Sequence, residues 1–377
     1  MKQVAQRYIH NRTKAISVDW YMTKRCNYDC SYCVDYLHDF HSPNPPLEKM
    51  KLLVDAIEDK YWYNVQWSLC GGEPMIIPWF YDIVEYIGRS MPDEISVVTN
   101  GSIPADKIIK NFEFLDNIVF SIHFEYIHNK IEETLEKIIA IEKWRREWND
   151  THDKKKTFIA RFMVYPGQLD LIEKMWERLV EEDIEKIEFR NIRPQHGVTN
   201  ELRPGQNELI LGDNTGSVST ADKIKKKAER RSKGYDSEVF QQLIGRNSFY
   251  TQEEFDRINS WYKHKTDAKK RNNIERYWED GSVTVDHYNT MTLNKDNNYK
   301  GWTCWAGVQH LKVDPDGRVF IGSCHRGGPI GNIYELDEGF ELPTKPTVCD
   351  RTWCGDYLDL RVPKAAPGYE HLLKDYV

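Results

Sequence analysis

Three cysteines near the start of the sequence are spaced for metal chemistry. Cys26, Cys30 and Cys33 are separated by three and two residues in the run CNYDCSYC. Three thiolates on one short loop can bind three irons of a cubane [4Fe-4S] cluster and leave the fourth iron with an open coordination position. The spacing therefore predicts an iron-sulfur site with room for a further ligand. Zinc remains open as an alternative, because His38 and His41 are near in sequence.

A second set of cysteines occupies a C-terminal segment: Cys304, Cys324, Cys349 and Cys354. Four thiolates are enough to hold one complete [4Fe-4S] cluster or one zinc ion. His325, beside Cys324, is an alternative ligand. The eighth cysteine, Cys70, is expected to be a small buried residue.

The composition is that of a globular protein. The 377 residues are 40% hydrophobic and 29% charged, and the formal net charge of -7 argues against general attraction to nucleic acid or anionic lipid. We find no secretory signal and no membrane-length apolar run, so a cytoplasmic location and no membrane partner are expected. Cytosolic thiols stay reduced, which makes metal binding the leading account of the cysteines.

The chain from residue 15 to residue 194 alternates short β-like runs with amphipathic helical runs, which is typical of βα units around a parallel sheet. Six units are too few for a closed eight-stranded barrel. The predicted fold class is therefore α/β, a partial (β/α)6 TIM-like barrel with a small C-terminal α+β domain, and its active face is expected at the C-terminal ends of the strands. Strands are predicted at 15–20, 64–69, 94–99, 118–123, 157–164 and 186–189, and helices at 47–60, 79–89, 130–148 and 168–182.

Three parts of the chain are predicted: the barrel at 1–194, an insert at 195–300, and the cysteine-bearing domain with its tail at 301–377. The insert is polar, and between residues 221 and 277 it carries 15 Lys or Arg against 9 Asp or Glu. Its most basic stretch is residues 223–234, and we expect a helical segment here. In the last part, DPDGRVF predicts a hairpin with Asp316 and Gly317 in its turn.

The first cysteine loop resembles the C-x3-C-x-aromatic-C motif that defines the radical S-adenosylmethionine superfamily, with Tyr32 in the aromatic position. The resemblance implies that the open iron binds the amino and carboxylate groups of S-adenosylmethionine. An external donor such as flavodoxin or ferredoxin would supply the electron that cleaves it to a 5′-deoxyadenosyl radical. The protein would then direct this radical at one C–H bond of its substrate.

A second motif follows the second predicted strand. Gly71, Gly72, Glu73 and Pro74 resemble the GGEP motif of the same superfamily, whose backbone and Glu side chain hold the ammonium of the methionine moiety. Paired glycines let a backbone approach closely, and a carboxylate pairs with a cation in a dry site.

Later strand ends carry weaker matches. Asn100 resembles the superfamily's Asn-Gly turn near the cofactor or is an ordinary turn residue, and Ser121 either reaches the ribose or is a satisfied strand hydroxyl. Arg161, also counted among the cofactor-binding residues, either faces the barrel and pairs with a carboxylate or lies on the less buried face. His123 and Glu125 are expected at the same active face of the barrel. There they either contact the substrate or have their hydrogen bonds satisfied within the protein.

The segment from 302 to 356 resembles the auxiliary-cluster domain of SPASM and the shorter Twitch enzymes, including the run that begins at Gly331. With four cysteines, one auxiliary [4Fe-4S] cluster of the Twitch type is implied. Two departures leave its ligands open: the gap from Gly317 to Cys324 is two residues longer than usual, and the last pair is C-x4-C where C-x2-C is common.

These resemblances imply an oxidoreductase or maturase that modifies a peptide or protein side chain oxidatively. Only about fifteen residues precede the first predicted strand, so recognition of a leader peptide would fall to a separate protein or to the insert. One alternative is oxidation or rearrangement of a small molecule or nucleoside. Another is modification of a nucleic-acid base through the basic insert, whose aromatic residues are Tyr250, Trp261, Tyr262 and Tyr277. A non-catalytic iron-sulfur protein is the last alternative, against which the GGEP motif argues.

Overall fold

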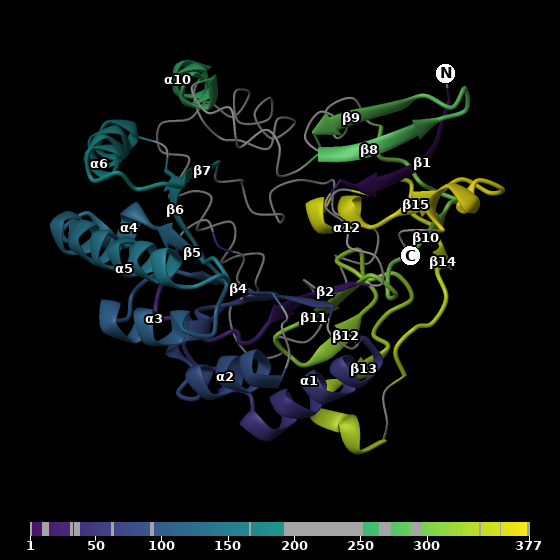
Figure 1. Ribbon diagram of the computed structural model, residues 1–377, viewed down its shortest axis with the longest axis horizontal. Coiled ribbons are helices and arrows are strands. Elements are labelled where there is room, and N and C mark those ends of the chain that lie inside the picture. The colour runs from purple at the N-terminus through teal and green to yellow at the C-terminus, as the bar shows by residue number, and fades with distance from the viewer. Residues whose placement is uncertain are drawn as a thin grey trace, which may run out of the picture.

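Two β-sheets organise the molecule (Figure 1). The structure is a computed structural model that describes residues 2–9, 15–30, 33, 38–61, 64–90, 94–165, 167–191, 252–263, 273–287, 291, 296–338, 341–354 and 356–374. The larger sheet has nine strands in the order β13-β12-β11-β2-β3-β4-β5-β6-β7, and the smaller has six in the order β14-β10-β15-β1-β8-β9.

All six strands expected from the sequence are present, and each pairs in parallel with the next along the chain. They are β2 (Ile16–Tyr21), β3 (Val65–Cys70), β4 (Glu94–Thr99), β5 (Asn117–Ile122), β6 (Thr157–Val164) and β7 (Ile187–Asn191). The α/β class and the parallel sheet are therefore confirmed.

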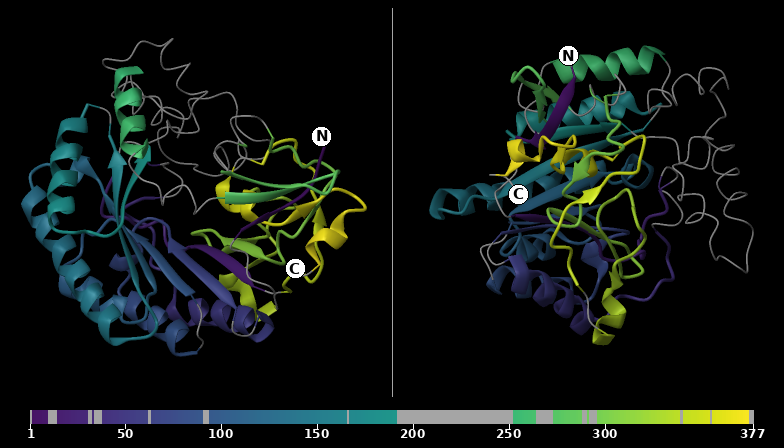
Figure 2. Two further views of the ribbon diagram at one scale, coloured as in Figure 1. Left: turned by 45° about the horizontal axis from the view of Figure 1, so that its top comes forward. Right: turned by 90° about the vertical axis from the view of Figure 1, so that its right-hand side faces the viewer.

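Helices cover one face of this sheet (Figures 1 and 2). They are α1 (Leu47–Tyr61), α2 (Phe80–Ser90), α3 (Ala105–Phe112), α4 (Phe124–Ile127), α5 (Ile131–Thr151) and α6 (Leu169–Glu181), with the 3-10 turn η1 (Pro74–Ile76) between β3 and α2. Strand residues alternate between the two faces. In β3, for example, Val65, Trp67 and Leu69 are buried in the helix-side core, whereas Gln66, Ser68 and Cys70 face the opposite, concave side. Polar residues of the neighbouring strands, such as Asp19 and Arg161, face the same side.

The predicted hairpin at 314–317 is confirmed, with β11 (His310–Val313) antiparallel to β12 (Arg318–Phe320). Its surroundings were not predicted. Strand β11 pairs in parallel with β2, and β12 pairs with β13 (Gly331–Asn332), which leads into η3 (Ile333–Glu338). The C-terminal part of the chain therefore extends the main sheet beyond β2.

The smaller sheet crosses the predicted domain boundaries. Strand β1 (Gln3–Tyr8) lies between β8 (Asn273–Trp278) and β15 (Lys364–Ala365), and not beside the barrel strands. Its remaining strands are β9 (Val283–His287), β10 (Thr303–Cys304) and β14 (Thr347–Val348), and the short helices α12 (Tyr357–Arg361) and η4 (Glu370–Leu373) flank it. The boundaries 1–194, 195–300 and 301–377 stay a proposal.

The expectation of a helical insert is wrong over residues 273–287, where β8 and β9 form a hairpin that pairs with β1. Alternation marks this strand, because Ile274 and Arg276 are buried while their neighbours are less so. Helix α10 (Gln252–Lys263) is helical as expected and packs on α6, where Arg257 pairs with Asp170 (2.7 Å) and Glu173. The basic stretch at 223–234 lies outside the described residues.

Trp261 of α10 is not available as an exposed platform for a base. It is 3% exposed, packs against Trp176 and Phe189, and donates to Glu173 Oε1 at 2.8 Å. The Tyr277 hydroxyl is engaged by neighbouring side chains as well. Two of the four aromatic residues behind the nucleic-acid hypothesis are thus structural, while Tyr250 and the side chain of Tyr262 lie outside the described residues.

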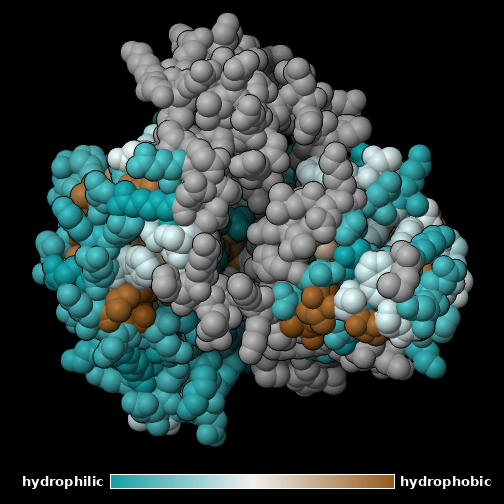
Figure 3. All heavy atoms as spheres, turned by 90° about the horizontal axis from the view of Figure 1, so that it is seen from above, coloured by the Kyte–Doolittle hydropathy of each residue, from teal (hydrophilic) through white to brown (hydrophobic). Residues whose placement is uncertain are grey.

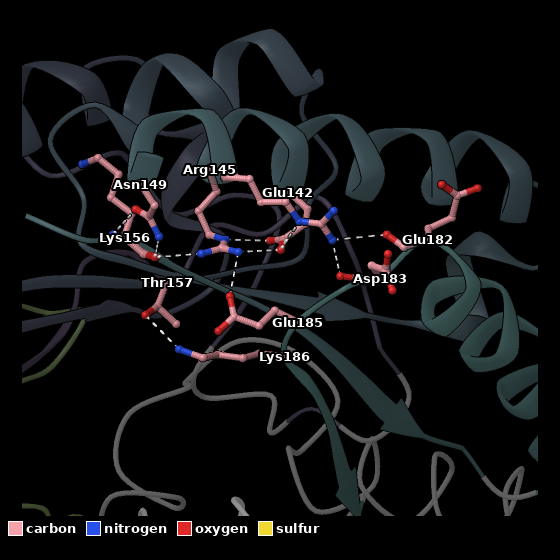
Figure 4. A network of polar contacts seen from close by, with 10 residues as sticks. Glu142, Arg145, Asn149, Lys156, Thr157, Glu182, Asp183, Glu185 and Lys186 are labelled. Atoms are coloured by element: carbon pink, nitrogen blue, oxygen red, sulfur yellow. Dashed lines mark hydrogen bonds and ion pairs between the residues drawn. The ribbon is translucent and has the colours of Figure 1, made fainter. Parts of the chain in front are cut away.

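A buried ion pair ties helix α5 to the loops that precede β6 and β7 (Figure 4). Arg145, 7% exposed, donates from Nε and Nη2 to the two carboxylate oxygens of Glu142 at 2.8 and 2.7 Å, and Glu142 is 1% exposed. Arg145 Nη2 also lies 2.7 Å from Glu185 Oε2. These loops lie at the N-terminal ends of the strands, so the network supports the barrel at the edge opposite the cysteine loop.

Replacing Glu142 by glutamine is expected to destabilise the protein by about 3 kcal/mol, because among the described residues it leaves the half-exposed Glu185 as the remaining carboxylate for the buried Arg145 guanidinium. The midpoint of urea unfolding of the apoprotein measures this. The exposed pair Lys51–Glu48 (3.1 Å) is the control, and Glu48→Gln should cost less than about 1 kcal/mol. Equal effects of the two substitutions would contradict the assigned role of the buried pair.

Seen from above, the described surface is mostly hydrophilic, and its hydrophobic residues form small separate patches (Figure 3). Among the described residues, no helix combines the length and the apolar character that crossing a membrane requires.

Candidate active site

The Gly-Gly-Glu turn after β3 packs directly on the segment that leads into the first cysteine loop. Gly72 N donates to Thr23 O at 2.7 Å and Glu73 N donates to Arg25 O at 2.9 Å. An added Cβ would lie 2.6 Å from Thr23 O at Gly71 and 2.3 Å from Arg25 O at Gly72. Both glycines are therefore required for this close approach.

Glu73 joins the end of β3 to the end of β4 through its buried carboxylate. It is 1% exposed and accepts hydrogen bonds from Thr99 Oγ1 (2.7 Å), Asn100 N (2.5 Å) and Met75 N (3.0 Å). Burial raises the pKa of this carboxyl to about 7, although the three hydrogen bonds lower it. The sequence predicted Glu73 as a ligand-binding residue, and its use as a tie between strands was missed.

Asn100 lies against the cysteine loop, and its predicted contact with the cofactor stays a prediction. Its Nδ2 is 3.0 Å from Asn27 Oδ1 and 3.9 Å from Cys26 Sγ. Because its backbone N–H also donates to Glu73, this one residue connects the Gly-Gly-Glu turn to the first cysteine.

The cysteine loop is held at both ends. Cys26 N donates to Asp39 O at 2.8 Å, and Asp39 N donates to Lys24 O at 2.7 Å. Cys33 N donates to Cys30 O at 2.9 Å, which turns the second and third cysteines toward each other. Burial raises the pKa of Cys26 to about 11, and the charges of Glu73 and Cys33 add to this, so metal binding must displace a tightly held proton.

His123, directly after β5, reaches the same loop: its Nδ1 lies 3.3 Å from Cys30 Sγ. Burial lowers the pKa of this imidazole to about 4, so it is neutral at pH 7. Tyr28 stacks on Tyr126 with ring centroids 4.1 Å apart and meets His123 edge-on. This aromatic group covers one side of the loop, and the sequence reading missed both tyrosines.

Of the two histidines that kept zinc open, His38 is 6% exposed and its Nε2 lies 3.2 Å from Asp29 Oδ1, and His41 is exposed. Tyr32 lies outside the described residues.

Ser121 and Arg161 face the concave side of the sheet and are opposite each other in the pairing of β5 with β6. Arg161 Nε and Nη2 both donate to Glu188 Oε2 on β7, at 3.0 and 2.9 Å. Of the two readings of Arg161, the carboxylate-paired one matches this geometry. Ser121 is 5% exposed. Their roles toward a cofactor stay predictions.

A polar group on the concave face was missed by the sequence reading. Asp19 of β2 is 3% exposed, Cys70 Sγ donates to its Oδ1 at 3.6 Å, and its Oδ2 has no hydrogen-bond partner among the residues that the structure describes. Lys312 of β11 is opposite Asp19 in the strand pairing, and its ammonium lies 4.8 Å from the Tyr21 ring. A charged residue inside the apolar strand ISVDWY was the available signal.

Asp19 makes stability depend on pH in an unusual direction. Burial raises its pKa from 3.8 to about 7, with Lys312 lowering it and Asp356 raising it. The folded state therefore keeps a proton that the unfolded chain has lost, so stability falls as pH rises from about 4 to about 7. Replacement by asparagine removes this loss, and Asp19→Asn should gain a few kcal/mol relative to wild type across that interval. Apoprotein unfolding midpoints between pH 5 and 8 test this, and a constant difference would contradict it.

The four C-terminal cysteines come together around the smaller sheet. Cys304 lies in β10, and Cys349 follows β14, which pairs with β10. Burial raises the pKa of the Cys324 thiol to about 12, and the charges of Cys304 and Cys349 contribute to this rise. Burial also raises the pKa of the Cys354 thiol, with contributions from the charges of Cys304 and Cys324 among others. Cys349 packs against the buried cluster that contains Cys304 and against the one that contains Cys354.

His325 stacks on Phe320, with ring centroids 4.1 Å apart. Among the described residues, no group of three or more His, Cys, Asp or Glu side chains converges as a single metal ion would require. A cubane cluster binds its thiolates at separate irons, so its ligands need not converge on one point. Both predicted clusters stay proposals on these side chains.

Residues 20–187 match the family model described as the Radical SAM superfamily. The chain is 23% identical over 172 residues to the S-adenosylmethionine-dependent nucleotide dehydratase RSAD2 of Siniperca chuatsi, covering 42% of this chain and 44% of that protein. It is 31% identical over 96 residues to an S-adenosylmethionine-dependent nucleotide dehydratase of Fibrobacter sp. (strain UWH6), covering 24% of this chain and 28% of that protein. Each match spans less than half of the relative's length.

Among solved structures, the chain is similar to Streptococcus suis SuiB bound to the precursor peptide SuiA. The identity is 11%, the TM-score is 0.44, and the match covers 88% of this chain and 66% of that one. The stretch that matches the family model, residues 20–187, includes Cys26, the Gly-Gly-Glu turn and Asn100. Both motifs of the site therefore lie in a stretch that matches the Radical SAM superfamily, although the matched residues 20–187 are less than half of the chain.

Proposed function

We propose that this protein is an enzyme that cleaves S-adenosylmethionine reductively at a [4Fe-4S] cluster held by Cys26, Cys30 and Cys33 and removes a hydrogen atom from its substrate. One observation carries the proposal: the Gly-Gly-Glu turn, Asn100 and the cysteine loop form one hydrogen-bonded unit at the C-terminal ends of β2, β3 and β4. Ligand sites in parallel α/β sheets lie at this edge.

The chain's own groups fit the two cofactors. The backbone at Gly71 and Gly72 leaves no room for side chains next to the loop, and the buried Glu73 carboxylate supplies negative charge for an ammonium group. Asn100 orients the start of the loop. When bound, the cluster supplies the electron that splits the sulfonium. Ser121, Arg161 and Tyr32 are proposed as further cofactor contacts.

We propose a second, auxiliary [4Fe-4S] cluster at Cys304, Cys324, Cys349 and Cys354. Its support is the packing of Cys349 against both Cys304 and Cys354 in the buried clusters of the smaller sheet, with Cys324 placed four residues after β12. A redox centre there would accept an electron from a substrate radical, which favours net oxidation of the substrate. An external reductant such as flavodoxin or ferredoxin is required for the first step.

The leading substrate hypothesis is a peptide or protein side chain, since an oxidative maturase is what the SPASM and Twitch resemblance implies. A nucleotide or other small molecule is the second candidate, and a specific observation favours it. The relatives matched at 23% and 31% identity are nucleotide dehydratases. The concave face also offers Asp19 Oδ2, which has no hydrogen-bond partner within the described part of the chain, as an acceptor for a hydroxyl or amino group.

The test is anaerobic reconstitution with iron, sulfide, S-adenosylmethionine and dithionite, followed by measurement of 5′-deoxyadenosine. The iron signal should change when S-adenosylmethionine is added. Peptides, nucleotides and nucleic acids are then compared for stimulation of turnover and for deuterium transfer into 5′-deoxyadenosine. Mononuclear zinc at the first loop, or an iron signal indifferent to S-adenosylmethionine, would overturn the proposal.

A further inference from the structure

A lysine is buried in the centre of the smaller sheet, among the C-terminal cysteines. Lys364 of β15 is 1% exposed. It is opposite Cys304 in the pairing with β10, and opposite Gln6 in the pairing with β1. Its ammonium donates to the carbonyls of Val362 (2.9 Å) and Asp359, and it lies 5.2 Å from the Tyr299 ring.

Burying an ammonium group is costly unless negative charge lies nearby. Side chains directly opposite each other in an antiparallel pair lie on one face of the sheet with Cβ atoms about 5 Å apart, so the Lys364 side chain lies beside Cys304. The Tyr299 ring near its ammonium packs in one buried cluster with Cys354, against which Cys349 also packs. The proposed cluster thiolates are therefore the negative charge that this position offers.

Lys156 supplies the comparison within the same chain. It is also buried, at 4% exposed, and its ammonium also donates to two backbone carbonyls, those of Glu113 (3.0 Å) and Leu115 (2.8 Å). Lys156 directly precedes β6 of the larger sheet, whereas Lys364 lies in the smaller sheet opposite Cys304. The two lysines therefore share burial and carbonyl bonding and differ in their position relative to the C-terminal cysteines.

We infer that Lys364 is a fixed positive charge that raises the reduction potential of the centre held by Cys304, Cys324, Cys349 and Cys354. This rests on the auxiliary-cluster part of the proposed function. One-electron reduction adds a negative charge to a centre whose four thiolates are already negative. A buried cation stabilises the reduced form more than the oxidised form, because the surroundings screen it weakly. Lys364 is thus a positioning residue for electron transfer.

The test uses the full chain with Cys26, Cys30 and Cys33 replaced by alanine, so that iron is bound only at the C-terminal thiols. Potentiometric titration followed by electron paramagnetic resonance compares Lys364→Met and Lys364→Gln with Lys156→Met. The glutamine keeps a donor for the two carbonyls and removes the charge. At a fixed potential, both Lys364 variants should show at least a tenfold lower ratio of reduced to oxidised cluster, which equals about 59 mV for one electron. Lys156→Met should match its parent.

The outcomes separate the inference from the proposed function. No iron in the triple-alanine parent would mean that the auxiliary-cluster proposal fails, and the inference with it. A loaded cluster whose potential is unchanged in Lys364→Gln would overturn the inference alone. Loss of iron from both Lys364 variants, with Lys156→Met loaded, would replace the tuning role by a structural one.

Discussion

Replacing Cys30 by alanine is expected to abolish formation of 5′-deoxyadenosine, down to the level of a control without protein. Cys30 is 5% exposed and lies between the first turn of the loop and His123. Without its thiolate, one iron of the proposed cluster loses its protein ligand. The measurement is anaerobic turnover with dithionite, together with iron content.

Replacing Cys349 by alanine should have a different effect. The auxiliary site is expected to act after cleavage, so 5′-deoxyadenosine formation without substrate should stay within about tenfold of wild type, about 1.4 kcal/mol in barrier height. Cys70→Ala is the matched control, since Cys70 belongs to neither set, and it should keep the full iron content. Equal loss of cleavage in Cys30→Ala and Cys349→Ala would reject this division of labour.

The main sheet was predictable because its signal is local. Strand β3 alternates Val65, Trp67 and Leu69 with polar residues, and helices of regular apolar spacing follow most of the strands. Parallel βα units then leave few arrangements open. The cysteine loop and the Gly-Gly-Glu turn could be singled out for the same reason, since each is a short local run that resembles a known motif.

The pairing of distant segments was not predictable in this way. Strand β1 joins β8 and β15, more than 260 residues away, and no feature of QVAQRY identifies these partners. The sequence of strand β11 predicts one half of a hairpin. It does not predict that the other edge of β11 pairs in parallel with β2. The same holds for the sites. Nothing in the sequence around Lys364 distinguishes it from other lysines. Its proposed role follows from the strand pairing that places it opposite Cys304.

Gly72→Ala is the second substitution expected to have a large effect, although it removes no functional group. The new Cβ would lie 2.3 Å from Arg25 O and 2.6 Å from Lys24 O. These are backbone atoms of the segment that leads into Cys26, so relief requires the loop to move. A shift of about 1 Å at a reacting centre costs about 100-fold in rate. We therefore expect cleavage of S-adenosylmethionine to fall by about that factor, with lower iron content.

Gly88→Ala in helix α2 is the matched control. Its added Cβ would lie 3.1 Å from the side chain of Phe114, which can turn away, and alanine suits a helix better than glycine. Cleavage and iron content should stay near wild type. If Gly72→Ala also kept both, the contact between the Gly-Gly-Glu turn and residues 23–25 would not position the loop. The cysteines would then owe their arrangement to the cluster that they bind, and the packing that the chain provides on its own would not be needed to form the site.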